Sequence, residues 1–289
     1  KAERTTEFTS SFTDYYCNTK TLKMGMKAYL HPSLPCEFRK LAIKNASGRK
    51  KNIILSAYIE PVLARFTDHF AHPAFMRLFL KQEYDNKHKI FIISRKERHS
   101  DDTTYMAIGF IDDVHFSYSM RREDVLTRPY GVFSAFDKAE DLTTSNEQVP
   151  DPCVFIKAPI HLDAYEQCEH TLFMCMAMTK EELLSRVAEL RSDNACHNIT
   201  TKPPLVADTI EGRLATTILP QLIYKKRDCS LNLKAIEENT LSPRELWVLG
   251  ISGDLPIVLV EIDSTVEDEK ITSYLKCHSS LKLCGIVFD

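Results

Sequence analysis

The sequence LKMGMKAYL at residues 22–30 places an apolar side chain at every second position, with lysine, glycine or tyrosine between them. Successive side chains of a strand point to opposite faces, so this spacing predicts a strand with one buried face. Residues 114–120 repeat the pattern. Further strands are expected over residues 37–44, 52–59, 89–94, 105–110, 153–160 and 170–178. About eight strands with short polar connectors are typical of an antiparallel β-sandwich, so the predicted fold class is mainly β.

The connection between two of these strands carries turn residues. Residues 45–48 read NASG, and asparagine, serine and glycine favour tight turns. We therefore expect the strands at 37–44 and 52–59 to form a hairpin.

A helical period replaces the period of two at Thr179. Thr179 followed by Glu182 is typical of a capping box. The apolar residues on the face of the following helix are Leu183, Leu184, Val187 and Leu190. A polar segment over residues 193–204 and a second helix over residues 211–224, interrupted by Pro220, then favour a helical linker.

The end of the chain is predicted to be a strand-helix-strand unit. Residues 255–262 are a continuous apolar strand, and Ser264 with Glu267 caps a helix. The expected helical face is Ile271, Tyr274, Leu275, His278 and Leu281. Gly285 suits a C-cap, and residues 286–288 start another strand. Because the unit stops inside this strand and the sequence does not begin with methionine, we expect the chain to be an excerpt of a longer polypeptide.

Length and composition favour an ordinary globular chain. The predicted domains are a β-sandwich at residues 1–179, a helical linker at 180–244 and a small α/β segment at 245–289. With 37 Lys and Arg against 40 Asp and Glu, nucleic acid is not an expected partner. The apolar runs fall short of the roughly 20 residues of a membrane helix, so no membrane span is expected. Nine cysteines without a C-x-x-C pair indicate reduced thiols and a cytoplasmic protein.

The most specific motif is WVLGISGDLPIV at residues 247–258. A phosphate-binding loop would lead into a helix, whereas this segment leads into a predicted strand and lacks G-K-[ST], so a nucleotide site is not expected. One interpretation is a tight turn that needs positive φ at its glycines. Its structural residues would be Gly250, Gly253 and Pro256. The other interpretation is a polar cavity where an indole stacks on a sugar. Its substrate-binding residues would be Trp247, Ser252 and Asp254.

A second motif covers residues 58–75. His69 and His72 could share a helical face as metal ligands, but no third ligand follows at a suitable spacing, so no metal site is predicted. We interpret Glu60, Arg65 and His72 as interface residues, with Glu60 and Arg65 as an ion pair.

Two arginines follow the predicted strand at residues 114–120. Arg122 and Arg128 could clamp an anion through bidentate hydrogen bonds, or they could be solvated loop charges. Arg128 is kept as a candidate substrate-binding residue. The sequence contains no G-x-S-x-G, H-E-x-x-H or usable Cys-His pattern, so no catalytic residue is predicted.

Several segments together resemble a known family. They are residues 56–63, 71–75 with 78–79, 122–123 with Arg128, 151–153 and, above all, GISGDLPI at residues 250–257. They are similar to the region before the catalytic barrel of cellobiose-phosphorylase-like inverting glycoside phosphorylases, especially β-1,2-oligoglucan phosphorylases and the carboxyl-terminal part of cyclic β-1,2-glucan synthases. The likeness runs from about Met26 to Asp289. It departs from the family at Thr127, where a glycine usually precedes the arginine.

The resemblance implies a β-sandwich and helical linker followed by an (α/α)6 barrel, which this chain lacks. On that barrel an aspartate protonates the glycosidic oxygen while inorganic phosphate, the co-substrate, attacks the anomeric carbon. No other cofactor is implied. The implied partners are a β-linked gluco-oligosaccharide, the barrel of the same polypeptide and a second copy in a homodimer.

We therefore expect the non-catalytic amino-terminal portion of a β-glucan phosphorylase, with β-1,2-linked oligoglucans as substrates. One alternative is a segment of a cyclic β-1,2-glucan synthase. Another is a stand-alone carbohydrate-binding or assembly module. If the chain is part of a phosphorylase, the turn at residues 250–256 would contribute to the substrate or phosphate site beside the barrel.

Overall fold

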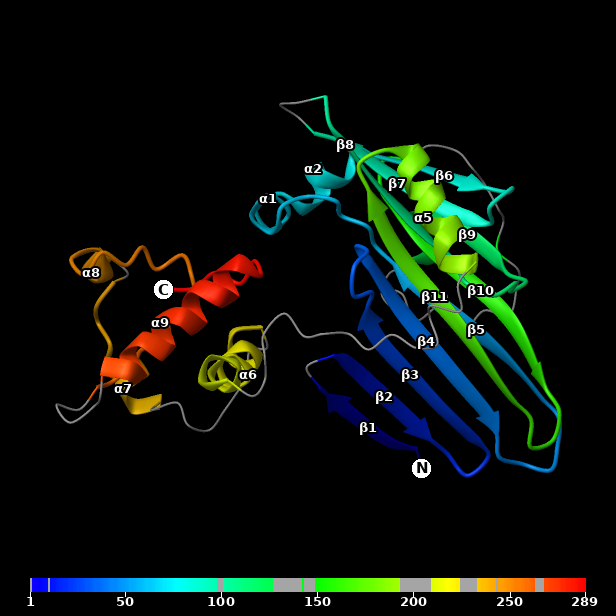
Figure 1. The fold of residues 1–289 in the computed structure, drawn as a ribbon, viewed down its shortest axis with the longest axis horizontal. Helices are drawn as coiled ribbons and strands as arrows, with labels where there is room; N and C mark the ends of the chain where they lie inside the picture. Colours follow the sequence, from blue (N-terminus) through cyan, green and yellow to red (C-terminus); the bar gives the residue numbers. More distant parts are fainter. Residues whose placement is uncertain are drawn as a thin grey trace. The chain divides into compact units, whose positions relative to one another are not determined.

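The chain folds as two compact units, residues 1–201 and 202–289, which are described separately (Figure 1). The computed structural model describes residues 2–9, 11–97, 101–126, 142, 149–192, 209–223, 233–242, 244–262 and 268–289. The first unit is a mainly β, antiparallel sandwich, as the alternating sequence pattern predicts. The described part of the second unit is helical.

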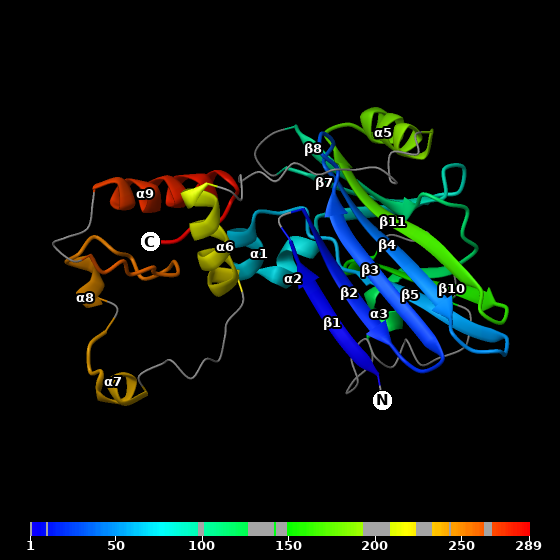
Figure 2. The same cartoon turned by 60° about the horizontal axis from the view of Figure 1, so that its bottom comes forward.

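The larger sheet of the sandwich has eight strands in the order β1-β2-β3-β4-β11-β8-β7-β6. Their bounds are β1 Glu3–Phe8, β2 Phe12–Asn18, β3 Leu22–Leu30, β4 Cys36–Asn45, β6 Leu80–Asp85, β7 Ile90–Lys96, β8 Thr103–Phe110 and β11 Gln167–Ala177. Every neighbouring pair is antiparallel. β1 lies at one edge of the sheet (Figure 2). The sequence did not predict β1, β2 or β6, so the sheet is wider than expected.

A smaller sheet packs against one face of the larger one. It contains β5 Lys51–Ile59, β10 Pro152–Leu162 and β9 Ser117–Arg121, in that order. Apolar side chains from both sheets fill the space between them, among them Phe91, Ile93, Ile108, Phe110, Met120, Val154 and Ile156. Full burial of each such side chain stabilises the fold by about 1.5–3 kcal/mol. This shared core holds the two sheets together.

Helix α5, Lys180–Ser192, lies along β11 and contacts β8 on the larger sheet (Figure 1). The predicted cap is confirmed, because Thr179 Oγ1 accepts the Glu182 N–H at 3.1 Å and Glu182 Oε2 accepts the Met178 N–H at 3.1 Å. The side chains buried beneath the helix are Leu183, Val187 and Leu190. At the other end, Arg191 donates to the Phe110 carbonyl at 2.8 Å. The helix therefore belongs to the sandwich unit.

The predicted hairpin between β4 and β5 is wrong, because the two strands lie in different sheets. Asn45, at the end of β4, is fully buried and fixes the connection as an arch. Its Nδ2 donates to the carbonyls of Arg49 at 2.7 Å and Asp163 at 2.8 Å, and its Oδ1 accepts the Ser47 N–H at 3.0 Å. Asp163 lies between β10 and β11, which also belong to different sheets. Asn45 thus joins two neighbouring arches.

Short helices occupy two connections of the sandwich. Helices α1, Phe66–Ala71, and α2, Pro73–Arg77, lie between β5 and β6. Helix α3, Arg122–Val125, follows β9 directly. These helices bring charged side chains to one end of the smaller sheet.

The second unit is built around two helices that pack on each other. Its helices are α6 Ile210–Ile223, α7 Leu233–Glu238, α8 Arg244–Trp247 and α9 Asp268–Leu283. The core between α6 and α9 includes Ala215, Cys277, Leu281 and Phe288. Pro220 lies within α6 and does not end it, contrary to the expected interruption. On α9 the small Ser273 and Cys277 are buried, whereas Leu275, placed on the buried face by prediction, is exposed.

The apolar run at residues 255–262 does not form the predicted strand. Backbone hydrogen bonds join the run to the chain end: the Val258 N–H donates to the Asp289 carbonyl at 2.8 Å, and the Pro256 carbonyl accepts the Asp289 N–H at 2.9 Å. Leu259 is 79% exposed, so the run is not covered on both faces. The expected caps Ser264 and Glu267 lie outside the described residues.

Candidate functional site

Four charged side chains from separate segments meet at one end of the smaller sheet. Glu60 follows β5, Arg77 ends α2, Arg122 begins α3 and Asp151 precedes β10. Each arginine contacts both carboxylates. We call these four residues the arginine–carboxylate cluster.

The distances in the arginine–carboxylate cluster describe a closed ring of ion pairs. Arg77 donates to Glu60 Oε2 at 2.6 Å and to Asp151 Oδ1 at 3.1 Å. Arg122 donates to Glu60 Oε1 at 3.0 Å and to Asp151 Oδ2 at 3.1 Å. The Tyr58 hydroxyl also donates to Glu60. All four oxygens of the two carboxylates are therefore engaged by arginine.

The electrostatics of the cluster favour the charged forms of its members. Burial raises the pKa of Glu60, but hydrogen bonds from Tyr58 and Arg122 and the charge of Arg77 outweigh it, so the pKa lies below its usual value. Burial and the hydrogen bond to Glu60 raise the pKa of Tyr58. Burial, followed by the charge of Glu60, raises the pKa of the neighbouring Cys153 to about 12. The cluster thus keeps Glu60 ionised, while Tyr58 and Cys153 stay protonated at neutral pH.

This arrangement suits a structural clamp better than a catalytic pair. A general acid needs a carboxyl group that holds a proton near neutral pH, whereas Glu60 is held as the anion. The clamp fixes the segment that carries α1 and α2. Exposed apolar side chains on this segment are Phe70, Phe75, Leu78 and Phe79.

The cluster changes two expectations for the charged motifs. Glu60 pairs with Arg77 and Arg122 instead of Arg65, which is exposed at the start of α1. Arg122 binds two carboxylates of the chain itself, whereas the sequence suggested that it could bind an anionic ligand together with Arg128. Arg128 lies outside the described residues. His72 lies exposed between α1 and α2.

The turn after α8 holds the predicted site residues of the second unit close together. Trp247, 61% exposed, donates through its indole N–H to the Ser252 carbonyl at 3.1 Å. Ser252 Oγ accepts the Asp254 N–H at 3.2 Å, so serine provides the side-chain contact within the turn. Gly250 and Gly253 have φ of +76° and +80°.

Gly250 ends α8 as a C-cap. The Gly250 N–H donates to the Trp247 carbonyl at 2.9 Å, and the Ile251 N–H donates to the Leu246 carbonyl at 3.1 Å. These two bonds are those of a Schellman motif, which needs a left-handed residue. Pro256 lies beyond the turn and contacts the chain end through its carbonyl.

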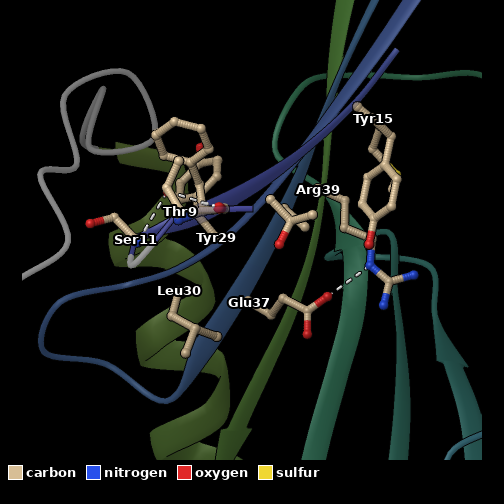
Figure 3. Close-up of a pocket in the computed structure, with 11 residues that line it drawn as sticks. Thr9, Ser11, Tyr15, Tyr29, Leu30, Glu37 and Arg39 are labelled. Atoms are coloured by element: carbon tan, nitrogen blue, oxygen red, sulfur yellow. Dashed lines mark hydrogen bonds and ion pairs between the residues drawn. The ribbon is translucent and has the colours of Figure 1, made fainter. Parts of the chain in front are cut away.

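A groove on the sandwich lies over β2, β3 and β4 and the connection between β1 and β2. It has a volume of about 460 Å³. Figure 3 shows its lining, with Glu37 extended to the Arg39 guanidinium. The lining residues are Thr9, Ser11, Phe12, Thr13, Tyr15, Met26, Ala28, Tyr29, Leu30, Glu37 and Arg39. We call this surface the β1–β4 groove.

Across the part of the chain that the structure describes, no three His, Cys, Asp or Glu side chains converge as metal ligands. No described helix has the length and apolar character needed to cross a bilayer.

The fold defines a class of protein, the antiparallel β-supersandwich modules. Residues 1–193 match the family described as glycosyl hydrolase 94, supersandwich domain. The chain therefore belongs to this supersandwich domain family.

A curated relative extends the likeness beyond the sandwich. The chain is 23% identical over 270 residues to the cyclic β-(1,2)-glucan synthase NdvB of Rhizobium meliloti (strain 1021). The match covers 88% of this chain and 10% of that protein. The chain thus spans a tenth of the length of this relative.

Two solved structures are similar to part of the chain. A bacterial glucoamylase complexed with acarbose has a TM-score of 0.44 at 11% identity, covering 67% of this chain and 26% of that chain. A protein described as a kojibiose phosphorylase from the human microbiome has a TM-score of 0.39 at 8% identity, covering 63% of this chain and 21% of that chain.

Sequence reasoning missed Arg77 and the β1–β4 groove. Arg77 is distant in sequence from Asp151, and no local pattern signals their contact. The groove depends on β2 and on its connection to β1, neither of which was predicted. The available signal was the pair of aromatic residues Phe12 and Tyr15 in a stretch rich in threonine, a residue enriched in strands.

Proposed function

We propose that the chain is the non-catalytic amino-terminal portion of an inverting β-glucan phosphorylase that acts on β-1,2-linked gluco-oligosaccharides. The observation that carries this proposal is the supersandwich family match over residues 1–193. The glucan synthase relative, matched over 88% of the chain, supports β-1,2-glucan as the substrate class. The parent protein would work in the cytoplasm.

The reaction would be completed by a barrel in the same polypeptide. Inorganic phosphate attacks the anomeric carbon, the glycosidic carbon–oxygen bond breaks, and an acid on the barrel protonates the departing oxygen. Inversion at a β-linked carbon gives α-D-glucose 1-phosphate. In this scheme the carboxylates of the described sandwich are not required as acid or base. This agrees with the structure, in which arginines bind all four carboxylate oxygens of Glu60 and Asp151.

The chain would contribute surfaces to this assembly. The segment with α1 and α2 presents exposed Phe70, Phe75 and Leu78, and the arginine–carboxylate cluster holds that segment in place. We assign this face, with Glu60, Arg65 and His72 at its base, to contact with the barrel or a second copy. Trp247, Ser252, Asp254 and Arg128 are assigned to the substrate site.

A second candidate is a segment of a cyclic β-1,2-glucan synthase that adjusts chain length. The relative named NdvB favours it, because its match runs through both units of this chain. The two candidates differ in their use of phosphate.

The test is phosphate-dependent release of glucose 1-phosphate from β-1,2-gluco-oligosaccharides. The natural polypeptide that carries this sequence should release the α-anomer, identified by NMR, and the 289-residue chain alone should release none. If the polypeptide changes the length of glucans without requiring phosphate, the synthase segment would be favoured over the phosphorylase as the function. Activity of the isolated chain would refute its non-catalytic role.

A further inference from the structure

We propose that the β1–β4 groove is a binding site for a neutral gluco-oligosaccharide. The ligand class rests on the proposed function, whereas the site rests on the geometry of the groove. Its parts are an aromatic side chain, an apolar floor and an internally neutralised pair of charged groups.

Strand register places these parts on one face of the sheet. Tyr15 of β2 is opposite Met26 of β3, and Ala28 of β3 is opposite Arg39 of β4. Residues directly opposite each other in a sheet point to the same face, and every second residue of a strand shares that face. Tyr15, Met26, Ala28, Leu30, Glu37 and Arg39 therefore project together, which agrees with their shared lining of the groove.

The aromatic part is suited to a pyranose ring. Tyr15 is 40% exposed, and Phe8 of β1 contacts it edge-on, with ring centroids 6.5 Å apart and planes at 79°. The edge contact fixes the Tyr15 ring and leaves part of its surface to solvent. The C–H groups of a sugar ring can pack on such a surface, and Met26 and Ala28 continue it as an apolar floor.

The polar part is suited to hydroxyl groups. Arg39 Nε donates to Glu37 Oε1 at 2.7 Å. Within the described residues the terminal nitrogens of Arg39 have no hydrogen-bond partner, so they can donate to a ligand. A guanidinium supplies donors in a fixed fork and a carboxylate supplies acceptors, which together match neighbouring sugar hydroxyls. Thr13 adds a hydroxyl to the same lining.

The charge balance favours a neutral ligand. Among the described residues that line the groove, Glu37 and Arg39 are the charged ones, and they neutralise each other. A phosphate or uronate would meet the Glu37 carboxylate beside the arginine. A volume of about 460 Å³ lies within the range of ligand sites, roughly 300–1,000 Å³.

The opposite face of the same strands offers a matched control. Tyr16 follows Tyr15 and is 41% exposed, almost the same as Tyr15. Its hydroxyl donates to Asp14 at 3.1 Å, and its ring lies over Gly25. Asp14 in turn pairs with Lys27 at 3.3 Å. The two tyrosines thus differ in face and environment, not in exposure.

The experiment is titration calorimetry of the 289-residue chain with β-1,2-glucotetraose, with tetragalacturonate as an anionic probe. The neutral oligosaccharide should bind more tightly than the anion. Tyr15→Ala should weaken binding by about tenfold or more, the effect of losing one central aromatic contact. Tyr15→Phe should retain binding, Arg39→Gln should weaken it, and Tyr16→Ala should change it by less than about twofold. Thermal unfolding of each variant would verify folding.

Three outcomes would overturn the proposal: no binding of the neutral oligosaccharide, tighter binding of the anion, or undiminished binding in folded Tyr15→Ala and Arg39→Gln variants. The proposed function is tested separately by glucose 1-phosphate release from the parent polypeptide. Sugar binding by the chain without glucose 1-phosphate release by the parent would refute the proposed phosphorylase function and support the proposed sugar site in the groove. Glucose 1-phosphate release by the parent without sugar binding by this chain would support the proposed function and refute the sugar site in the groove.

Discussion

The arginine–carboxylate cluster and the β1–β4 groove use the same side-chain types in opposite ways. In the cluster, Arg77 and Arg122 each hold two carboxylates, and the Arg77 side chain is only 15% exposed. In the groove, Arg39 holds one carboxylate through Nε, and its side chain is 38% exposed. An arginine that bridges two carboxylates stabilises a fold, whereas one with exposed remaining donors beside an aromatic ring can bind a ligand.

The largest expected contrast is in thiol reactivity. Cys153 lies next to the cluster, and a pKa raised to about 12 from 9.0 lowers its thiolate fraction about 10³-fold. Cys17 lies on the same face of β2 as Tyr15 and is partly exposed. Under native conditions we expect iodoacetamide to label Cys17 at least about 10³-fold faster than Cys153, as measured by peptide mass spectrometry. Comparable labelling rates would show that the end of the smaller sheet opens readily.

The next effect is on stability. Arg77→Met leaves Glu60 and Asp151 with one arginine each, so we expect the free energy of unfolding to fall by about 2–3 kcal/mol. Chemical denaturation measures this change. The matched control is Lys96→Met, which removes an ion pair with Asp101 at the surface and should change stability by less than about 1 kcal/mol. Equal effects of the two variants would mean that the cluster is not a clamp.

A smaller effect concerns pH. The pKa of Glu60 is lower in the folded state, so its contribution to stability is present above the pKa of the unfolded glutamate, roughly 4.3. It is lost as the pH falls through the folded value. We expect Glu60→Gln to reduce the acid-induced loss of stability below about pH 4.3, by about 1 kcal/mol, in unfolding curves recorded at several pH values. An unchanged pH profile would contradict this assignment.

The smallest effect is expected in the groove. Arg39→Gln removes one partly exposed ion pair, so the free energy of unfolding should change by less than about 0.5 kcal/mol. The same variant should weaken sugar binding. A loss of stability comparable to that of Arg77→Met would show that Arg39 is structural, and the contrast between the two regions would disappear.

Local patterns predicted the parts of the fold that depend on local physics. The alternation at residues 22–30 coincides with β3, and the cap at Thr179 begins α5 as expected. β1 was missed because all of its residues are exposed, so no apolar period marks it. The NASG turn was recognised, but its sequence does not determine which sheet the next strand joins. That choice depends on the buried bonds from Asn45 to Arg49 and Asp163.

The candidate sites were less predictable because they combine distant segments. Glu60 was identified, but its partners Arg77 and Arg122 come from two helices that are far apart in sequence. The second carboxylate that these arginines hold, Asp151, precedes β10. The apolar run at residues 255–262 would form a buried strand only if other layers covered its hydrophobic side chains. In the structure Leu259 is exposed, so the run lacks the covering layers that the prediction assumed.

The buried amide of Asn45 also bears on chemical modification. Residues 45–47 match the acceptor pattern for N-linked glycans, in which Ser47 occupies the hydroxyl position. The nitrogen that would carry the sugar is Nδ2, which already donates to the carbonyls of Arg49 and Asp163. A glycan attached there would break at least one of these bonds and could not be accommodated beneath the two arches. The folded sandwich therefore excludes glycosylation at this acceptor site.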